Sequence, residues 1–157
     1  MNKEIIKVGR TLAINLDGHG VAPILAKVDT GAYLCAIWAS NVHEDDKTLF
    51  YTLFGEGSEY YNGQELSTSE YYVTEVENSF GVSESRYVVK LHFRPHKLEQ
   101  GGEKSMRFSL CNRSMKKYPI LIGRNYLRGR CVVDVRMTAV DNIGDDEEDH
   151  KNKLDEE

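Results

Sequence analysis

The segment best suited to chemistry is a polar turn that directly follows an apolar stretch. Residues 26–32 read Ala-Lys-Val-Asp-Thr-Gly-Ala, so an expected strand delivers Asp29 into a tight turn. Thr30 can hydrogen-bond locally there, and Gly31 lets the backbone come close to the carboxylate. The carboxylate is therefore well placed for general acid–base work. Taken alone, the three residues fit an ordinary strand-ending turn equally well.

A second segment lies about 90 residues further along the chain. Residues 120–125 read Ile-Leu-Ile-Gly-Arg-Asn and lead into a short expected helix, and residues 131–135 read Cys-Val-Val-Asp-Val. Together with the Asp29 turn, this pattern resembles the retropepsin-like aspartic proteases. The resemblance implies a closed all-β barrel in which residues 120–123 form the floor under Asp29. It also implies that Asp29, Thr30 and Gly31 are catalytic, and that Ala32, Ile122, Gly123 and Arg124 support the active site, Arg124 through ion pairs.

The resemblance covers about residues 8–137 and is similar in detail to a bacterial and archaeal group labelled ATP-dependent zinc proteases. The segments that carry it are residues 8–10, 26–32, 84–89, 111–115, 120–124 and 127–134. The sequence has no His-Glu-x-x-His motif, no nucleotide-binding glycine-rich loop and no Cys/His cluster with zinc spacing. The residues therefore favour an aspartic mechanism without cofactor or metal. Residues 33–35 (Tyr-Leu-Cys) depart from the family's small polar residues, which affects the expected substrate preference.

A single Asp-Thr-Gly motif implies two chains. Aspartic proteolysis needs two carboxylates, one as the general base on water and one protonated to polarise the scissile carbonyl. Asp17, Asp134 and Asp141 lack the Thr/Ser-Gly context. The second carboxylate is most simply Asp29 of a second copy related by a two-fold axis, so we expect a homodimer.

Covering such a site requires a hairpin. Residues 55–63 and residues 78–85 both join strand-like runs and contain glycine. The sequence does not choose between these two candidates.

The remaining pattern predicts an all-β domain, because helical periodicity is scarce and short β-branched or aromatic runs recur between turn residues. The expected strands cover residues 5–8, 12–16, 24–28, 36–38, 48–54, 70–76, 86–93, 106–110, 120–122 and 131–135. The expected helix covers residues 124–128 and is stopped by Gly129.

Length and charge predict one domain followed by an acidic tail. The 157 residues suit a single domain, set at about residues 4–140, and no stretch approaches the roughly 20 apolar residues of a membrane span. With no secretory segment at residues 1–8, we expect a cytoplasmic protein. Residues 141–157 hold nine acidic residues and two lysines, whereas the other 140 residues hold 16 acidic and 18 basic residues. The tail is therefore expected to be a solvated, disordered extension.

Positive charge is concentrated in residues 86–136, which hold 13 Lys and Arg against three acidic residues. This excess favours an anionic partner, although such side chains can also be ordinary solubilising groups. No nucleic-acid-binding motif is present, so a nucleic-acid partner is not expected. An acidic polypeptide substrate is expected instead, and members of the family are often linked with the ligase that adds glutamate tails to a ribosomal protein.

Cysteine and histidine offer weaker alternatives. Cys35, Cys111 and Cys131 are far apart and are expected to be reduced and buried. A Cys35 nucleophile lacks a suitably placed histidine.

The histidines give no strong metal signal. His92 and His96 are the nearest approach to a metal-binding pair, but Pro95 disfavours the helix that would align them. His43, beside the acidic residues 44–46, is expected in an exposed loop, and His19 in a turn.

The leading hypothesis is therefore a dimeric retropepsin-like aspartic endopeptidase. The alternative is a non-catalytic peptide-binding or dimerisation module on the same fold. The zinc protease of the family label is a third hypothesis, and it predicts that chelators abolish activity.

Overall fold

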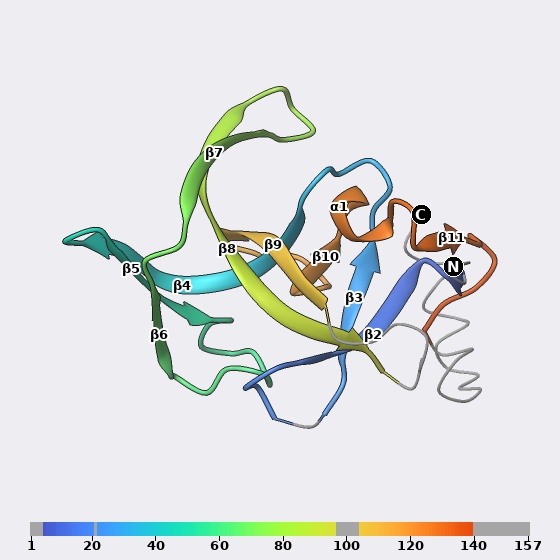
Figure 1. The fold of residues 1–157 in the computed structure, drawn as a ribbon, viewed down its shortest axis with the longest axis horizontal. Helices are drawn as coiled ribbons and strands as arrows, with labels where there is room; N and C mark the ends of the chain where they lie inside the picture. The colour runs from blue at the N-terminus through green and yellow to red at the C-terminus, as the bar shows by residue number, and fades with distance from the viewer. Residues whose placement is uncertain (1–4, 21, 97–103, 140–157) are drawn as a thin grey trace.

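A computed structural model of the protein describes residues 5–20, 22–96 and 104–139, and most of these residues lie in strands (Figure 1). The strands are β1 (Ile6–Val8), β2 (Thr11–Leu16), β3 (Ile24–Val28), β4 (Cys35–Asp45), β5 (Thr48–Leu53), β6 (Glu65–Thr68), β7 (Tyr72–Glu77), β8 (Ser83–Pro95), β9 (Lys104–Cys111), β10 (Ile120–Ile122) and β11 (Cys131–Val133). One short helix, α1 (Arg124–Leu127), occurs among the described residues. The expected all-β fold is confirmed. No described helix has the length and apolar character needed to span a membrane.

Six strands close into a barrel in the order β10, β3, β2, β8, β9 and β4, and the pairing of β4 with β10 completes the ring. β3 and β10 run parallel, and Val28 lies opposite Ile122 at the end of their pairing. The chain segments that follow these two strands therefore leave the barrel side by side. This places residue 29 next to residue 123, although they are far apart in sequence.

The barrel interior is filled by side chains that alternate along the strands. Its buried members include Leu12, Ile14, Ala26, Ile37, Val89, Leu91, Phe93, Phe108, Leu110 and Ile120. Tyr126 of α1 joins the same core, and its ring centroid lies 5.0 Å from that of Phe93. Burial of one such aromatic side chain contributes about 3 kcal/mol. The helix is therefore tied to the barrel by packing.

An arm extends the sheet beyond the barrel, because β4 continues outward to pair with β5, and β5 pairs with β6. The β4–β5 turn consists of Asp46 and Lys47, which have φ values of 47° and 60°. Two residues with positive φ match the turn type that suits the twist of a two-residue hairpin.

The arm corrects two expectations. The loop expected at His43 and residues 44–46 is wrong, since His43 to Asp45 belong to β4 and only Asp46 lies in the turn. The strand expected at 36–38 is correspondingly too short, and β6 was not expected. Polar residues have low strand propensity, and here pairing with β5 overrides it. The other expected strands occur with ends within three residues of those expected.

The two hairpin candidates differ in their packing. Tyr60 and Tyr61, within residues 55–63, pack against the core, and the carbonyl oxygen of Tyr60 lies 2.6 Å from His19 Nε2. The tip of the β7–β8 hairpin is open, with Phe80 89% exposed. Figure 1 shows this hairpin rising from the barrel on the side where the loop after β3 and α1 lie. The tip of this hairpin is therefore exposed, whereas residues 55–63 are part of the packed body.

Both ends of the described chain meet in a two-stranded parallel ribbon of β1 and β11. Asp134 follows β11 and donates its backbone N–H to the carbonyl oxygen of Val8 at 2.8 Å. The carboxylate of Asp134 accepts hydrogen bonds from Arg136 Nη2 at 2.8 Å and Arg136 Nε at 3.0 Å. These hydrogen bonds hold the pKa of the Asp134 carboxyl well below its usual range.

This lowered pKa makes a pH-dependent contribution to stability. A carboxyl group whose pKa is lower in the folded state stabilises the fold above its unfolded pKa, near 4, and that contribution is lost as pH falls toward the folded pKa. We predict that Asp134→Asn lowers Tm at pH 7, and that the difference from wild type shrinks below about pH 4. Thermal denaturation across pH checks this, with Asp17→Asn, in an exposed turn, as the control. A difference that stays constant down to pH 2 would contradict the assignment.

Candidate active site

The Asp29 turn is held by backbone hydrogen bonds immediately after β3. Asp29 donates its N–H to the carbonyl oxygen of Ile122 at 2.9 Å, and Gly31 donates its N–H to Asp29 Oδ1 at 2.9 Å. Asp29 is half-buried, while Thr30 and Gly31 are exposed. One carboxylate oxygen is therefore fixed in direction at an accessible edge of the barrel.

The start of α1 docks onto the loop that follows this turn. Arg124 and Asn125 donate their N–H groups to the carbonyl oxygens of Ala32 and Tyr33, both at 2.8 Å. Gly123 faces the same loop, and a Cβ at this position would lie 2.5 Å from the carbonyl oxygen of Leu34. Position 123 therefore admits only glycine without a backbone shift.

The structure thus brings the seven residues that the sequence singled out into one contiguous group. They are Asp29, Thr30, Gly31, Ala32, Ile122, Gly123 and Arg124. Arg124 reaches back to the turn, where its Nη1 donates to the carbonyl oxygen of Thr30 at 3.0 Å and its guanidinium lies 6.0 Å from the ring centroid of Tyr33. The ion pairs implied for Arg124 and the catalytic roles stay predictions.

Sequence reasoning missed the part played by Asn125. Its Oδ1 accepts hydrogen bonds from the Cys35 N–H at 3.0 Å and from Cys35 Sγ at 3.1 Å, and its Nδ2 donates to the carbonyl oxygen of Arg107 at 2.9 Å. One side chain therefore joins the end of the Asp29 loop, α1 and β9. The sequence signal that could have revealed this role is the position of Asn125 in the Gly-Arg-Asn motif.

Cys35 is a structural group in this arrangement. Its side chain is buried, and its sulfur also accepts the N–H of Gly123 at 3.4 Å. Burial raises the pKa of the Cys35 thiol to about 11, so the thiol is neutral near pH 7. A neutral, buried thiol is a poor nucleophile.

Residues that lie opposite one another in the barrel strands share a face. Lys27 is paired with Leu121, Leu121 with Ala36, Ala36 with Ser109, and Ser109 with Val88. We call these five residues the outer barrel face, because their neighbours in each strand point into the core. Asp29 follows Lys27 by two residues. The outer barrel face therefore borders the Asp29 turn at Lys27.

Two half-buried arginines lie along the same border. Arg86 precedes Val88 by two residues on β8 and so shares its face, and Arg86 Nη2 pairs with Glu84 at 3.2 Å. Arg113 follows β9, donates from Nε to the carbonyl oxygen of Tyr118 at 2.9 Å, and interacts electrostatically with Asp29 and Arg86. Burial lowers the pKa of the Arg113 guanidinium, and Cys111 and Asp29 act in the opposite direction.

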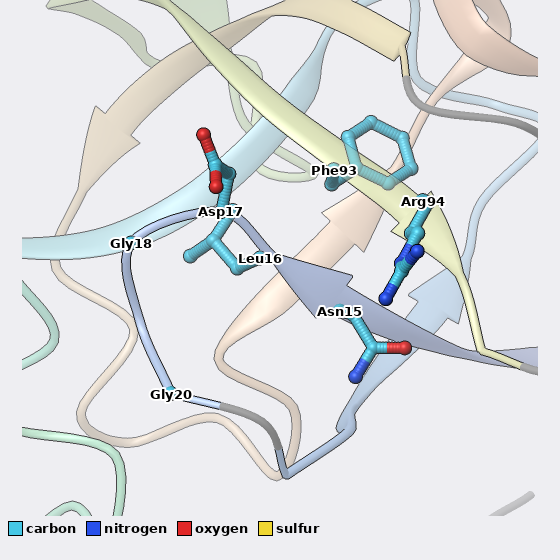
Figure 2. Close-up of a pocket in the computed structure, with 7 residues that line it drawn as sticks. All are labelled: Asn15, Leu16, Asp17, Gly18, Gly20, Phe93 and Arg94. Carbon is cyan, nitrogen blue, oxygen red and sulfur yellow. The ribbon is translucent and has the colours of Figure 1, made fainter.

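A hollow of about 280 Å³ lies elsewhere, at the far end of β2 from the Asp29 turn (Figure 2). Its lining residues are Asn15, Leu16, Asp17, Gly18, Gly20, Phe93 and Arg94. Figure 2 shows that the side chains of Asp17 and Arg94 do not point toward one another. No candidate catalytic residue lines the hollow, so it is separate from the site.

None of the described histidines belongs to a group of potential metal ligands. Within residues 5–20, 22–96 and 104–139, no group of three or more His, Cys, Asp or Glu side chains is arranged to hold a metal ion. His92 lies in β8 and His96 directly follows this strand, where its Nδ1 lies 2.9 Å from Asn15 Oδ1.

The central position of Asn125 gives a prediction. Asn125→Ala leaves the Cys35 N–H and the carbonyl oxygen of Arg107 without their partner, and we expect a loss of about 1–3 kcal/mol in the free energy of unfolding. Amide hydrogen exchange should accelerate in residues 30–36. Asn125→Asp keeps the acceptor oxygen and should cost less. Chemical denaturation of the two variants checks this, and equal losses would contradict the proposed role of the acceptor.

Comparison with known proteins gives one family and one fold relative. Residues 7–142 match the model of the RimB-like family, described as the retropepsin-like aspartic endopeptidase RimB. Among solved structures, protein Lpg0085 of Legionella pneumophila subsp. pneumophila str. Philadelphia 1, whose function is unknown, is 23% identical with a TM-score of 0.63. The alignment covers 85% of this chain and 95% of that chain, and at this identity it shows the fold alone. No curated protein matches the sequence significantly.

Proposed function

The chain belongs to the RimB-like family of retropepsin-like aspartic endopeptidases, and from this premise we propose that it hydrolyses peptide bonds with paired Asp29 carboxylates. The observation that carries the proposal is the Asp29 turn, in which the Gly31 N–H fixes one carboxylate oxygen. One Asp29 takes a proton from water while the other, protonated, polarises the carbonyl. The water oxygen bonds to the carbonyl carbon, and the C–N bond then breaks as its nitrogen receives a proton.

The paired carboxylates come from a homodimer in this proposal, because each chain has one Asp-Thr-Gly motif. Three large exposed apolar side chains are available for such an interface. Tyr33 follows the Asp29 turn, Phe80 lies at the tip of the β7–β8 hairpin, and Met115 lies two residues after Arg113. Burial of these side chains against a second copy would remove apolar surface from water, which favours association.

The proposed substrate is an acidic polypeptide. Lys27, Arg86 and Arg113 border the Asp29 turn, and Arg113 is partly desolvated, which strengthens its attraction for a carboxylate. Arginine also suits carboxylate recognition because its donors form a planar fork. The β7–β8 hairpin, which carries Arg86 near its base, is the proposed lid over a bound peptide.

Asp29→Asn provides the direct test. The variant keeps the size of the side chain and removes the ionisable group, so we predict a loss of more than about 10³-fold in kcat/KM for peptide cleavage, with unchanged circular dichroism. Mass spectrometry of a cleaved peptide library gives the readout, and Asp17→Asn is the control. Cleavage at the wild-type rate by Asp29→Asn would refute the mechanism. Peptide binding without wild-type turnover would favour the non-catalytic module.

Subunit mixing tests the shared site. If each active site uses both Asp29 residues, an equimolar exchange of wild-type and Asp29→Asn subunits leaves about one quarter of the dimers fully wild type. Activity per total dimer should then fall to about one quarter of that of wild-type protein at the same total concentration. Activity that falls only to one half would indicate independent subunits, and sedimentation equilibrium gives the dimer population at each concentration.

The arginines give a prediction about specificity. Arg86→Gln and Arg113→Gln should each lower kcat/KM for an acidic peptide by about tenfold while leaving a neutral peptide nearly unaffected. Wild-type cleavage of acidic peptides should also weaken as salt rises. Arg94→Gln, in the separate hollow, is the matched control. An equal loss on both peptides would point to disturbed folding or catalysis instead of charge recognition.

A further inference from the structure

We propose that the chain's own acidic C-terminal segment, residues 141–157, binds at Arg86 and Arg113 and competes there with acidic polypeptides. The competing substrate rests on the proposed function, while the docking itself concerns two parts of this chain. The segment would act as a built-in inhibitor that an acidic partner displaces.

The acidic segment and the two arginines carry opposite charges. Residues 145–149 form an uninterrupted run of five acidic residues, and the whole segment carries a net charge of −7. Arg86 and Arg113 are both half-buried, and Arg86 Nε is buried with no hydrogen-bond partner among the described residues. Two neighbouring guanidinium groups attract carboxylates, because their planar forks of donors combine charge with hydrogen bonding.

The described chain ends against strand β2 of the barrel. Ala139, the last described residue, is buried and donates its N–H to Thr11 Oγ1 at 2.8 Å. Thr11 is paired with Lys27, two residues before Asp29. The backbone of Met137 is held in the same place, because its carbonyl oxygen accepts the Arg10 N–H at 2.8 Å. The described chain therefore ends one strand pairing away from Lys27.

The segment that follows Ala139 is long enough to reach the two arginines. Eighteen residues follow Ala139, and a chain of that length can span up to about 60 Å. This exceeds the width of a small barrel domain, so the acidic run can reach the arginines from its anchor. A tethered ligand has an effective concentration of the order of millimolar, so even weak binding of the segment would compete with a free peptide.

The main experiment uses the full chain with the five acidic residues neutralised (D145N, D146N, E147Q, E148Q and D149N). The probe is a fluorescein-labelled hexaglutamate, and its affinity is measured by anisotropy at 50 mM and 500 mM NaCl. We expect the neutralised chain to bind about tenfold more tightly at low salt, with the difference lost at high salt. The control chain keeps the composition of residues 141–157 in scrambled order and should behave as wild type. Equal affinity of the wild-type and neutralised chains at low salt would overturn the proposal.

A second measurement detects the docking without any substrate. A synthetic peptide of residues 141–157 should bind the neutralised chain, and adding Arg86→Gln or Arg113→Gln should weaken that binding at least about fivefold, whereas Arg94→Gln should not. Undiminished binding in both arginine variants would place the segment elsewhere and refute the proposed site.

The two proposals fail in different ways. Binding of the tail peptide at these arginines in the neutralised chain, together with no cleavage by wild type under any condition, would keep the docking and remove the peptidase. Normal cleavage together with no binding of the tail peptide would remove the docking and keep the peptidase.

Discussion

The arrangement of the molecule depends on the docking of the loop after β3 against the start of α1. A helix begins with N–H groups that have no partner within the helix, and here Arg124 and Asn125 donate theirs to the carbonyl oxygens of Ala32 and Tyr33. The same contact satisfies the polar backbone of a loop that leaves the barrel. Gly123 makes the close approach possible, because any side chain would collide with Leu34. The Asp29 carboxylate is oriented within this loop, where Gly31 donates its N–H to Asp29 Oδ1.

Much of the barrel could be predicted because its strands alternate clearly, and β3 occurs with the bounds expected from the pattern. The seven residues of the candidate site were identified from two motifs, and the parallel register of β3 and β10 explains why they meet. The outer half of β4 could not be predicted, since Asn41, His43 and Asp45 favour loops and only pairing with β5 extends them. The role of Asn125 was also hidden, because a side chain that reaches Cys35 across 90 residues leaves no periodic signal.

The inner and outer faces of the barrel differ in composition and in role. The inner face is apolar and supplies the packing, whereas the outer face near Asp29 combines small or apolar residues with cations at its border. The positive excess of residues 86–136 is evident from composition, but composition does not say which cations lie together. Strand alternation places Arg86 on the face of Val88, where it interacts electrostatically with Arg113, and the same strand carries Arg94 to a hollow at the other end of the barrel. Residues of one long strand can therefore belong to separate surface sites.

The β1–β11 ribbon also bears on the order in which the protein folds during synthesis. Ile6 is paired with Cys131, so β1 has its only strand partner, among the described elements, about 125 residues later in the chain. Contacts this distant in sequence carry a large loop-closure cost and form late. The hairpins of the arm and of β7–β8 are local and can form while translation continues. The ribbon must wait for β11, which follows the last barrel strand, β10, so the barrel can close before the ribbon pairs.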